Sequence, residues 1–250
     1  MTPLLDLLYV GLFAVVLPVI DYAIFWPAFR RASQADPARA RSWLWSWAIF
    51  AAWPVAGIGA WLWQANDRPW ALLGFSTPTG WRLWASGALL LLLAVYLVYA
   101  VAALATSPQA RNSVRRQFET FTDVLPHTRK ELSWFGAVSL TAGFCEEFLF
   151  RGYLIWALAP WLGWWGAAGV SVVIFAVGHA YQGRQGALRT GAVGALFTLV
   201  VAVFDSLWPA IAMHALLDLG QGTMAWLALS GREPVPEVVR DAEPSEHERG

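Results

Sequence analysis

The stretch GFCEEFLFRG, which runs from Gly143 to Gly152, is the part of the sequence that is most informative about the fold. It places Glu146, Glu147 and Arg151 within six residues, and long apolar runs flank it on both sides. An ionisable residue at the centre of a transmembrane helix costs roughly 2.5–3.5 kcal/mol on insertion scales, so it is kept mainly where it has a function. The stretch therefore predicts a polar site on a membrane-embedded helix.

The composition indicates an integral membrane protein. Hydrophobic residues make up 58% of the 250 residues and charged residues 14%, whereas soluble domains carry about 25% charged residues. The formal net charge is zero, so no basic excess indicates a nucleic-acid partner. The partner that the composition does predict is the lipid bilayer. Cys145 is the single cysteine, which excludes an internal disulfide, and we interpret it as a small buried thiol between helices.

Seven segments approach the roughly 20 apolar residues that a helix needs to cross the hydrocarbon core. They are 4–26, 43–64, 83–105, 133–158, 162–181, 190–204 and 207–229. The sequence thus predicts an all-α polytopic membrane protein with about seven transmembrane helices, six to eight, around a polar intramembrane cavity. We expect residues 1–230 to form a single transmembrane domain. Residues 231–250 are rich in Pro, Glu, Asp and Arg, and we expect them to be a disordered cytoplasmic tail.

The loop charges predict an orientation in the membrane. Arginines are frequent after the first and third segments and in the tail, and they are sparse in the intervening loops. The positive-inside rule then places the N-terminus outside and the C-terminus in the cytoplasm. Lys130 is the single lysine among 17 basic residues, a bias that we attribute to a GC-rich genome. We therefore expect a multi-pass protein of a bacterial plasma membrane.

The two glutamates have different surroundings on a helix. Glu147 and Arg151 are four residues apart and share one face, so their charges partly neutralise each other. Glu146 is turned by about 100° and cannot face the same arginine. This arrangement predicts one ion-paired carboxylate and one that points into a cavity as a general base. The alternative is a purely structural polar cluster that ties helices together.

Two further polar pairs lie in later apolar segments. His179 follows Phe175 by one turn, and His214 precedes Asp218 by one turn. Asp218 would orient the His214 imidazole by accepting a ring N–H, or both would face one pocket. Carboxylates and imidazoles from three helices can activate water and hold an oxyanion or a metal ion. The sequence therefore predicts a buried catalytic centre.

The ordered series Glu-Glu-x-x-x-Arg, Phe-x-x-x-His and His-x-x-x-Asp resembles the CAAX protease and bacteriocin-processing family (Abi, or CPBP) of intramembrane endopeptidases. The resemblance covers about residues 133–229. The residues that carry it are Glu146, Glu147, Arg151, Phe175, His179, His214 and Asp218. It implies an all-helical core whose polar cavity opens to the cytoplasm. It also implies hydrolysis of a peptide bond in a peptide or membrane-anchored protein, including a lipidated one, by an activated water.

The resemblance also implies roles for single residues. Glu146 would act with His179 to deprotonate water, and His214 with residue 218 would polarise the scissile carbonyl. Glu147 and Arg151 would shape the site. Eukaryotic prenyl-protein members have Asn at the last motif position, whereas this chain has Asp218. A carboxylate donates no hydrogen bond unless it is protonated, which puts an oxyanion-stabilising role at this position in question.

The sequence does not decide whether the protein uses a metal ion, or which of several functions it has. The family has been described both as metal-dependent and as a glutamate-type protease. Catalytic zinc usually has three protein ligands and a water, and Glu146, His179 and His214 would supply them to a Zn2+ ion. One alternative function is a non-catalytic membrane scaffold or immunity protein with the same fold. Another is a proton-coupled transporter, because intramembrane Glu, His and Asp also build proton relays.

Overall fold

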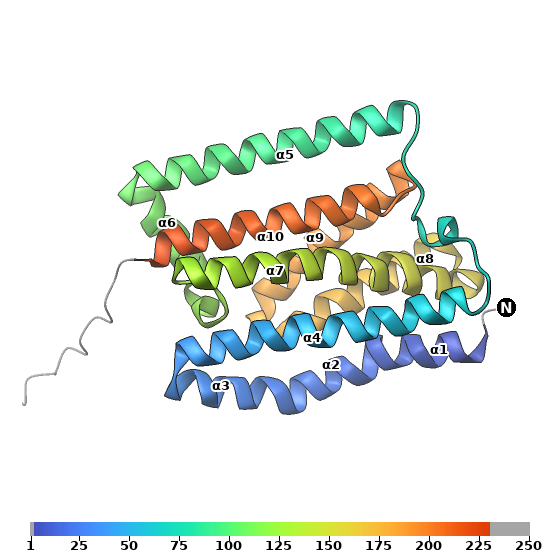
Figure 1. The fold of residues 1–250 in the computed structure, drawn as a ribbon, viewed down its shortest axis with the longest axis horizontal. Coiled ribbons are helices and arrows are strands. Elements are labelled where there is room, and N and C mark those ends of the chain that lie inside the picture. The colour runs from blue at the N-terminus through green and yellow to red at the C-terminus, as the bar shows by residue number, and fades with distance from the viewer. Residues whose placement is uncertain (1–2, 231–250) are drawn as a thin grey trace, which may run out of the picture.

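The computed structural model describes residues 3–230, and the side chains of residues 119–121 lie outside this description. Within this range the regular structure is helical and contains no strand. The predicted tail, 231–250, lies outside the described residues. The helices run nearly parallel and form an elongated bundle (Figure 1). The all-α fold predicted from the sequence is therefore confirmed.

The N-terminal third forms a helical hairpin. Its first arm is continuous from Leu4 to Ala35 and its second arm, α4, returns from Pro37 to Gln64. The Asp36 side chain caps α4 by accepting a hydrogen bond from the Arg39 backbone N–H. The first arm comprises α1 (Leu4–Gly11), η1 (Leu12–Val16), α2 (Leu17–Ile20), η2 (Asp21–Phe25) and α3 (Trp26–Ala35). Two of these pieces, η1 and η2, are π-helical turns.

The middle of the chain crosses the bundle once and then turns across its end. After the short η3 (Trp70–Leu73), α5 (Trp81–Thr106) runs the length of the molecule. The helix α6 (Pro108–Phe118) and the turn η4 (Glu119–Val124) then cross one end of the bundle (Figure 1). A capping box starts α7 (Arg129–Glu146): the Thr128 side chain accepts from the Glu131 N–H, and Glu131 accepts from the Thr128 N–H.

The C-terminal half contains a helical reversal. Helix α7 continues as the π-helical η5 (Glu147–Leu154) into α8 (Ile155–Gly178), and α8 is broken at Gly163, where φ is +67°. Only glycine adopts such a conformation readily. The second limb of α8 packs back on η5, because the Ser171 hydroxyl donates to the Phe150 carbonyl at 2.7 Å. The chain ends with η6 (Ala180–Gln182), α9 (Gly183–Phe204) and α10 (Trp208–Leu229).

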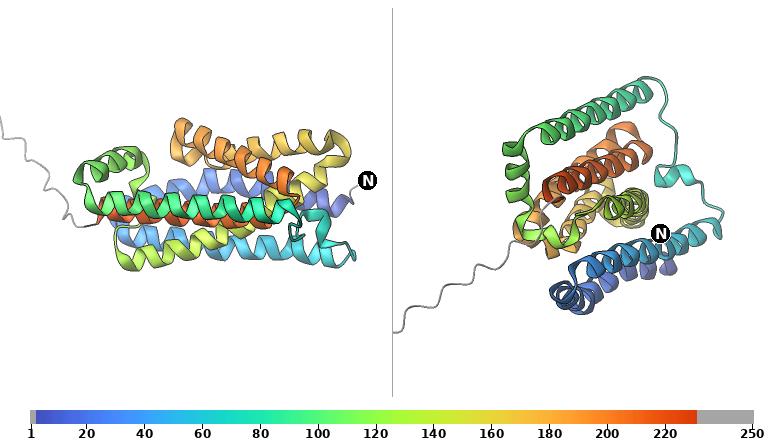
Figure 2. Two further views of the ribbon diagram at one scale, coloured as in Figure 1. Left: turned by 90° about the horizontal axis from the view of Figure 1, so that it is seen from above. Right: turned by 60° about the vertical axis from the view of Figure 1, so that its left-hand side comes forward.

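All seven predicted segments are helical. Segments 133–158 and 162–181 are the two sides of the Gly163 reversal, and the sixth starts at Gly183 instead of residue 190. Five helical stretches are long and apolar enough to cross a membrane: 4–35, 37–64, 81–106, 129–178 and 180–204. Helix α10 is outside this set because His214, Asp218, Gln221 and Thr223 dilute its apolar residues. It lies between α5 and α7 (Figures 1 and 2).

A buried ion pair joins α4 to α7 near the end that α6 crosses. The Arg41 Nη2 and Nε atoms donate to Glu131 Oε1 at 2.8 and 3.0 Å. Glu131 Oε2 accepts from the backbone N–H groups of His127 and Thr128. Its carboxylate therefore neutralises a buried guanidinium and caps a helix at the same time.

We predict that Glu131→Ala destabilises the fold by about 3–5 kcal/mol, because it leaves the buried Arg41 charge without a partner. Thermal unfolding in detergent would measure the change. The matched control is Arg82→Ala, which removes an exposed pair with Asp205 at 3.3 Å and should cost less than about 1 kcal/mol. Equal effects of the two substitutions would contradict the prediction.

Candidate active site

The predicted site residues come from α7, η5, the end of α8 and α10. Glu146 ends α7, Glu147 begins η5, and Arg151 lies one turn further along η5. His179 follows the last residue of α8, and His214 and Asp218 lie on α10. The π-helical geometry of η5 is notable, because π-turns inside α-helices occur frequently at functional sites.

Glu147 is the centre of a dry network. Its Oε1 atom accepts from Arg151 Nη1 at 3.1 Å and from His214 Nδ1 at 2.8 Å. Glu147 is 0% exposed, Arg151 2% and His214 6%. The Glu147–Arg151 pair predicted from the four-residue spacing is thus present. The Glu147–His214 contact was missed by the sequence analysis, which assigned the orientation of His214 to Asp218.

The other side of His214 faces two accessible carboxylates. Its Nε2 atom lies 3.5 Å from Asp218 Oδ2 and 3.8 Å from Glu146 Oε2. The Glu146 and Asp218 side chains are 29% and 33% exposed. The Phe197 ring stacks on the imidazole with a centroid distance of 5.1 Å. His214 therefore separates a buried half of the site, at Glu147, from an open half, at Glu146 and Asp218.

Arg151 is enclosed by aromatic rings. Its guanidinium carbon lies 4.1 Å from the Phe175 ring centroid and 5.9 Å from that of Phe197. These cation–π contacts favour the charged guanidinium in a dry environment. Within the described part of the chain, its Nε and Nη2 atoms have no hydrogen-bond partner, and neither does Glu147 Oε2. Gly194 makes room for the group, because a Cβ atom built there would lie 2.7 Å from Nη2.

His179 lies beside this network but makes no ion pair with it. Its Nδ1 atom is 2.8 Å from the Phe175 carbonyl oxygen. Donation of Nδ1–H to this carbonyl leaves Nε2 with a lone pair, free to accept a proton. Within residues 3–230 the ion pairs of the Glu146 carboxylate involve His214 and not His179. The predicted cooperation of Glu146 with His179 therefore requires a bridging water instead of a direct contact.

The Gly163 reversal explains how His179 reaches the site. The segment 162–181 predicted from the sequence ends two residues beyond His179. Glu147 and His179 each lie 16 residues from Gly163 along the chain, so the returning limb brings His179 back towards the depth of Glu147. Phe175, one turn before His179, also lies 6.4 Å from the His214 ring.

The structure brings two of the three predicted zinc ligands together, with Glu146 Oε2 3.8 Å from His214 Nε2. Both nitrogens of His214 face carboxylates, Glu147 on one side and Glu146 and Asp218 on the other. Among residues 3–230 no group of three or more His, Cys, Asp or Glu side chains is placed to hold a metal ion.

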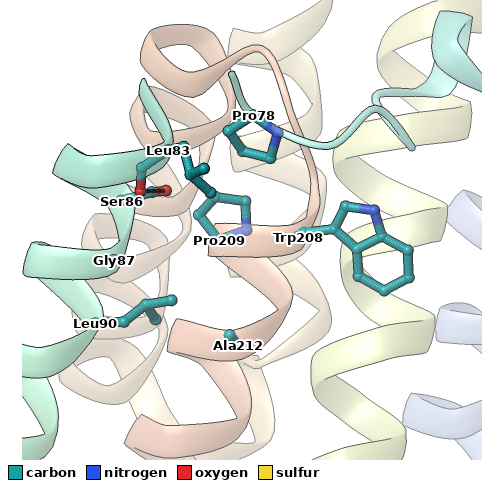
Figure 3. A pocket seen from close by; sticks show the side chains of 8 residues that line it. All are labelled: Pro78, Leu83, Ser86, Gly87, Leu90, Trp208, Pro209 and Ala212. Carbon is teal, nitrogen blue, oxygen red and sulfur yellow. Dashed lines mark hydrogen bonds between the residues drawn. The ribbon is translucent and has the colours of Figure 1, made fainter. Parts of the chain in front are cut away.

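A pocket of about 370 Å³ lies between α5 and α10, apart from the polar cluster (Figure 3). Its lining is almost entirely apolar: Pro78, Leu83, Ser86, Gly87, Leu90, Trp208, Pro209 and Ala212. No predicted site residue lines it, although Ala212 and His214 belong to the same helix. Its apolar lining carries no candidate acid, base or nucleophile other than the Ser86 hydroxyl.

We predict that Gly194→Ala costs about 1–3 kcal/mol, because the new methyl group would collide with Arg151 Nη2 and, at 3.0 Å, with Phe175. The unfolding midpoint in detergent would show the loss. Gly169→Ala is the matched control, since a Cβ atom there meets no atom within 4 Å and lies in helix α8. A neutral Gly194→Ala variant would show that the packing around Arg151 is loose.

Comparison with known proteins supports the sequence resemblance. Residues 128–220 match the family model described as type II CAAX prenyl endopeptidase Rce1-like. Comparison with the curated proteins and with the solved structures found no match. The matched segment extends from the capping box of α7 into α10 and contains every residue of the cluster described above. Residues 128–220 are thus similar to CAAX protease family domains of the Rce1-like type, and they lie within a multi-pass membrane protein.

Proposed function

We propose that this protein is an intramembrane endopeptidase in which Glu146 and His179 activate the water that hydrolyses a peptide bond. The observation that carries the proposal is the position of His214. Glu147 holds one imidazole nitrogen in the dry interior, while the other nitrogen faces the accessible Glu146 and Asp218. A fixed donor opposite an accessible base is the arrangement that acyl-group hydrolysis needs.

In this mechanism His214 is the electrophilic group. Carboxylates at both ring nitrogens favour the imidazolium form, which donates from both. Nδ1–H donates to Glu147, and Nε2–H is available to the carbonyl oxygen of the scissile bond. Asp218 then acts by holding the imidazolium and does not itself need to donate. This division of roles answers the question that Asp218 raises for oxyanion stabilisation.

Glu146 is the general base because, unlike Glu147, it is free of Arg151 and partly accessible to water. It takes one proton from a water that it shares with His179 Nε2, and the hydroxide oxygen forms a bond to the carbonyl carbon. The carbonyl electron pair moves to the oxygen, where His214 Nε2–H stabilises it. The oxyanion then collapses, the C–N bond breaks, and Glu146 returns the proton to the leaving amine.

The substrate that we propose is a peptide or a membrane-anchored protein, including a lipidated one. The cluster is built from helices that meet the length and composition of membrane spans, so a substrate that itself partitions into the membrane would be concentrated at the site. This choice also rests on the description of the family model, which names a prenyl endopeptidase.

We further propose that the end crossed by α6 faces the cytoplasm. Figure 1 shows the end of α3, the starts of α4 and α7, and α6 at this end, and these segments carry exposed basic residues. They are Arg30, Arg31, Arg39, Arg116, Arg129 and Lys130. At the opposite end Arg68 and Arg82 are paired with Asp6 and Asp205. The positive-inside rule then places the first end in the cytoplasm and the N-terminus outside, in a cell membrane that we take to be bacterial.

We predict that Glu146→Gln lowers kcat by about 10²–10⁴-fold while the protein stays folded, because an amide cannot take the proton from water. Cleavage of fluorogenic prenylated and leader-type peptides by the purified protein in detergent would measure this. Asp205→Asn, a carboxylate change at an exposed surface pair, should leave the rate unchanged, and so should a zinc chelator. If Glu146→Gln cleaved at the wild-type rate, the assignment of the base would be wrong. If the wild type cleaved nothing, a scaffold role would gain support.

We predict that Asp218→Asn keeps activity within about tenfold of wild type, whereas His214→Ala abolishes it. An amide of the same size can still accept from His214 Nε2–H and can also donate to the oxyanion. The same peptide assay, read as kcat and KM separately, would test this. A loss of activity in Asp218→Asn as deep as that in Glu146→Gln would show that the carboxylate takes part in proton transfer.

A further inference from the structure

Another ion pair, between Arg68 and Asp6, lies on the far side of η5 from the proposed active site. Asp6 on α1 is 1% exposed. Its Oδ1 and Oδ2 atoms accept from Arg68 Nη1 and Nη2 at 2.8 and 2.9 Å. The Tyr153 hydroxyl donates to the same Oδ1 atom. Tyr153 belongs to η5, so three chain segments meet at one carboxylate.

Aromatic rings enclose this carboxylate–guanidinium pair. The Arg68 guanidinium lies 5.2 Å from the Trp63 ring centroid and 4.8 Å from that of Trp156. Tyr153 is itself fully buried. A bidentate pair in such surroundings has a fixed geometry. If its two groups move apart, they lose both their electrostatic attraction and the two parallel hydrogen bonds. The Asp6–Arg68 pair is therefore rigid, and Tyr153 is held to this pair by the hydrogen bond from its hydroxyl.

The hydrogen bond of Tyr153 connects η5, which carries Glu147, to residues outside the matched segment. Asp6 and Arg68 both precede the matched segment 128–220, whereas Tyr153 lies within it. Tyr153 is two residues beyond Arg151 in the same π-helical turn. π-helical turns are rare and occur frequently at functional sites, so the contacts that hold η5 bear on the site. The rotation of η5 and its position along the helix axis decide whether Glu147 can accept hydrogen bonds from both Arg151 and His214.

We propose that Asp6, Arg68 and Tyr153 are positioning residues that hold η5 in the register in which Glu147 joins Arg151 to His214. They touch neither the reacting groups nor the accessible half of the site. The inference that these residues hold η5 in place rests on the structure alone. Its consequence for the rate of peptide cleavage rests on the proposed function.

Two tyrosines provide a matched pair of variants. Tyr153→Phe removes the hydroxyl that reaches Asp6, and Tyr9→Phe removes a neighbouring hydroxyl that donates to the Val55 carbonyl at 2.7 Å. The two rings are 4.8 Å apart in the same core. Both variants lose one buried hydrogen bond, but only Tyr153→Phe disconnects η5 from the ion pair.

The single cysteine is a built-in probe of the end of α7, directly before η5. Cys145 is 0% exposed and directly precedes Glu146. Its rate of reaction with N-ethylmaleimide in detergent therefore reports how often this part of the helix opens. We expect Tyr153→Phe to raise this rate about tenfold, because it removes the hydrogen bond that connects η5 to the Asp6 carboxylate, and Tyr9→Phe, which leaves that connection intact, to raise it by no more than about twofold.

The peptide assay adds a second readout: a fall in kcat at unchanged KM, which a general loss of stability would not produce. Tyr153→Phe should lower kcat about tenfold with KM unchanged, and Tyr9→Phe should change neither. Adding Asp6→Asn to Tyr153→Phe should lower kcat little further, because both changes cut the same connection. Faster labelling in Tyr153→Phe alone, in a preparation whose wild type cleaves no peptide, would support the positioning role and count against the protease.

Two results would overturn the inference. One is an unchanged Cys145 labelling rate in Tyr153→Phe. The other is an equal increase in Tyr9→Phe, since that would show that each hydroxyl merely stabilises the shared core. Tyr153→Phe carries this test because it leaves the Asp6–Arg68 pair intact, so a failure of Asp6→Asn to fold does not affect the conclusion.

Discussion

The burial of the Glu147 carboxylate is the constraint on which the rest of this structure depends. A charge in a low-dielectric interior is strongly unfavourable unless cations or hydrogen-bond donors meet it directly. Arg151 meets it from the same helix and His214 from α10, both at Oε1. The second contact fixes η5 against α10. The relative position of these two helices is thus set by electrostatics as much as by apolar packing.

Small residues allow the helices to come close enough for these contacts. At Gly143 a Cβ atom would lie 3.0 Å from the Ala215 Cβ and 3.1 Å from the Ile211 carbonyl oxygen. The backbones of α7 and α10 therefore touch one turn before the glutamates. On the other side of α10, Gly220 faces Leu97 of α5 at a similarly short distance. Close backbone approach at small residues is the usual basis of helix association in membranes.

The sequence predicts the parts of this structure that follow from local periodicity, and misses the contacts that depend on tertiary packing. Apolar length predicts the helices, including the reversal between segments 133–158 and 162–181, and a four-residue spacing predicts the Glu147–Arg151 pair. The Glu147–His214 contact is missed because the two residues are 67 positions apart. Asp6 and Tyr153 are 147 residues apart, so no spacing rule connects them either.

In the proposed mechanism the adjacent glutamates meet two opposite requirements that one carboxylate could not meet. A general base must exchange protons with water, so it has to be accessible. The imidazole that stabilises the oxyanion must be held without motion, which favours a dry partner with short hydrogen bonds. Adjacent positions on a helix point about 100° apart. Glu147 can therefore face the buried Arg151 while Glu146 faces the open side of the same His214. A single glutamate at either position would leave the imidazole unfixed or the water without a base.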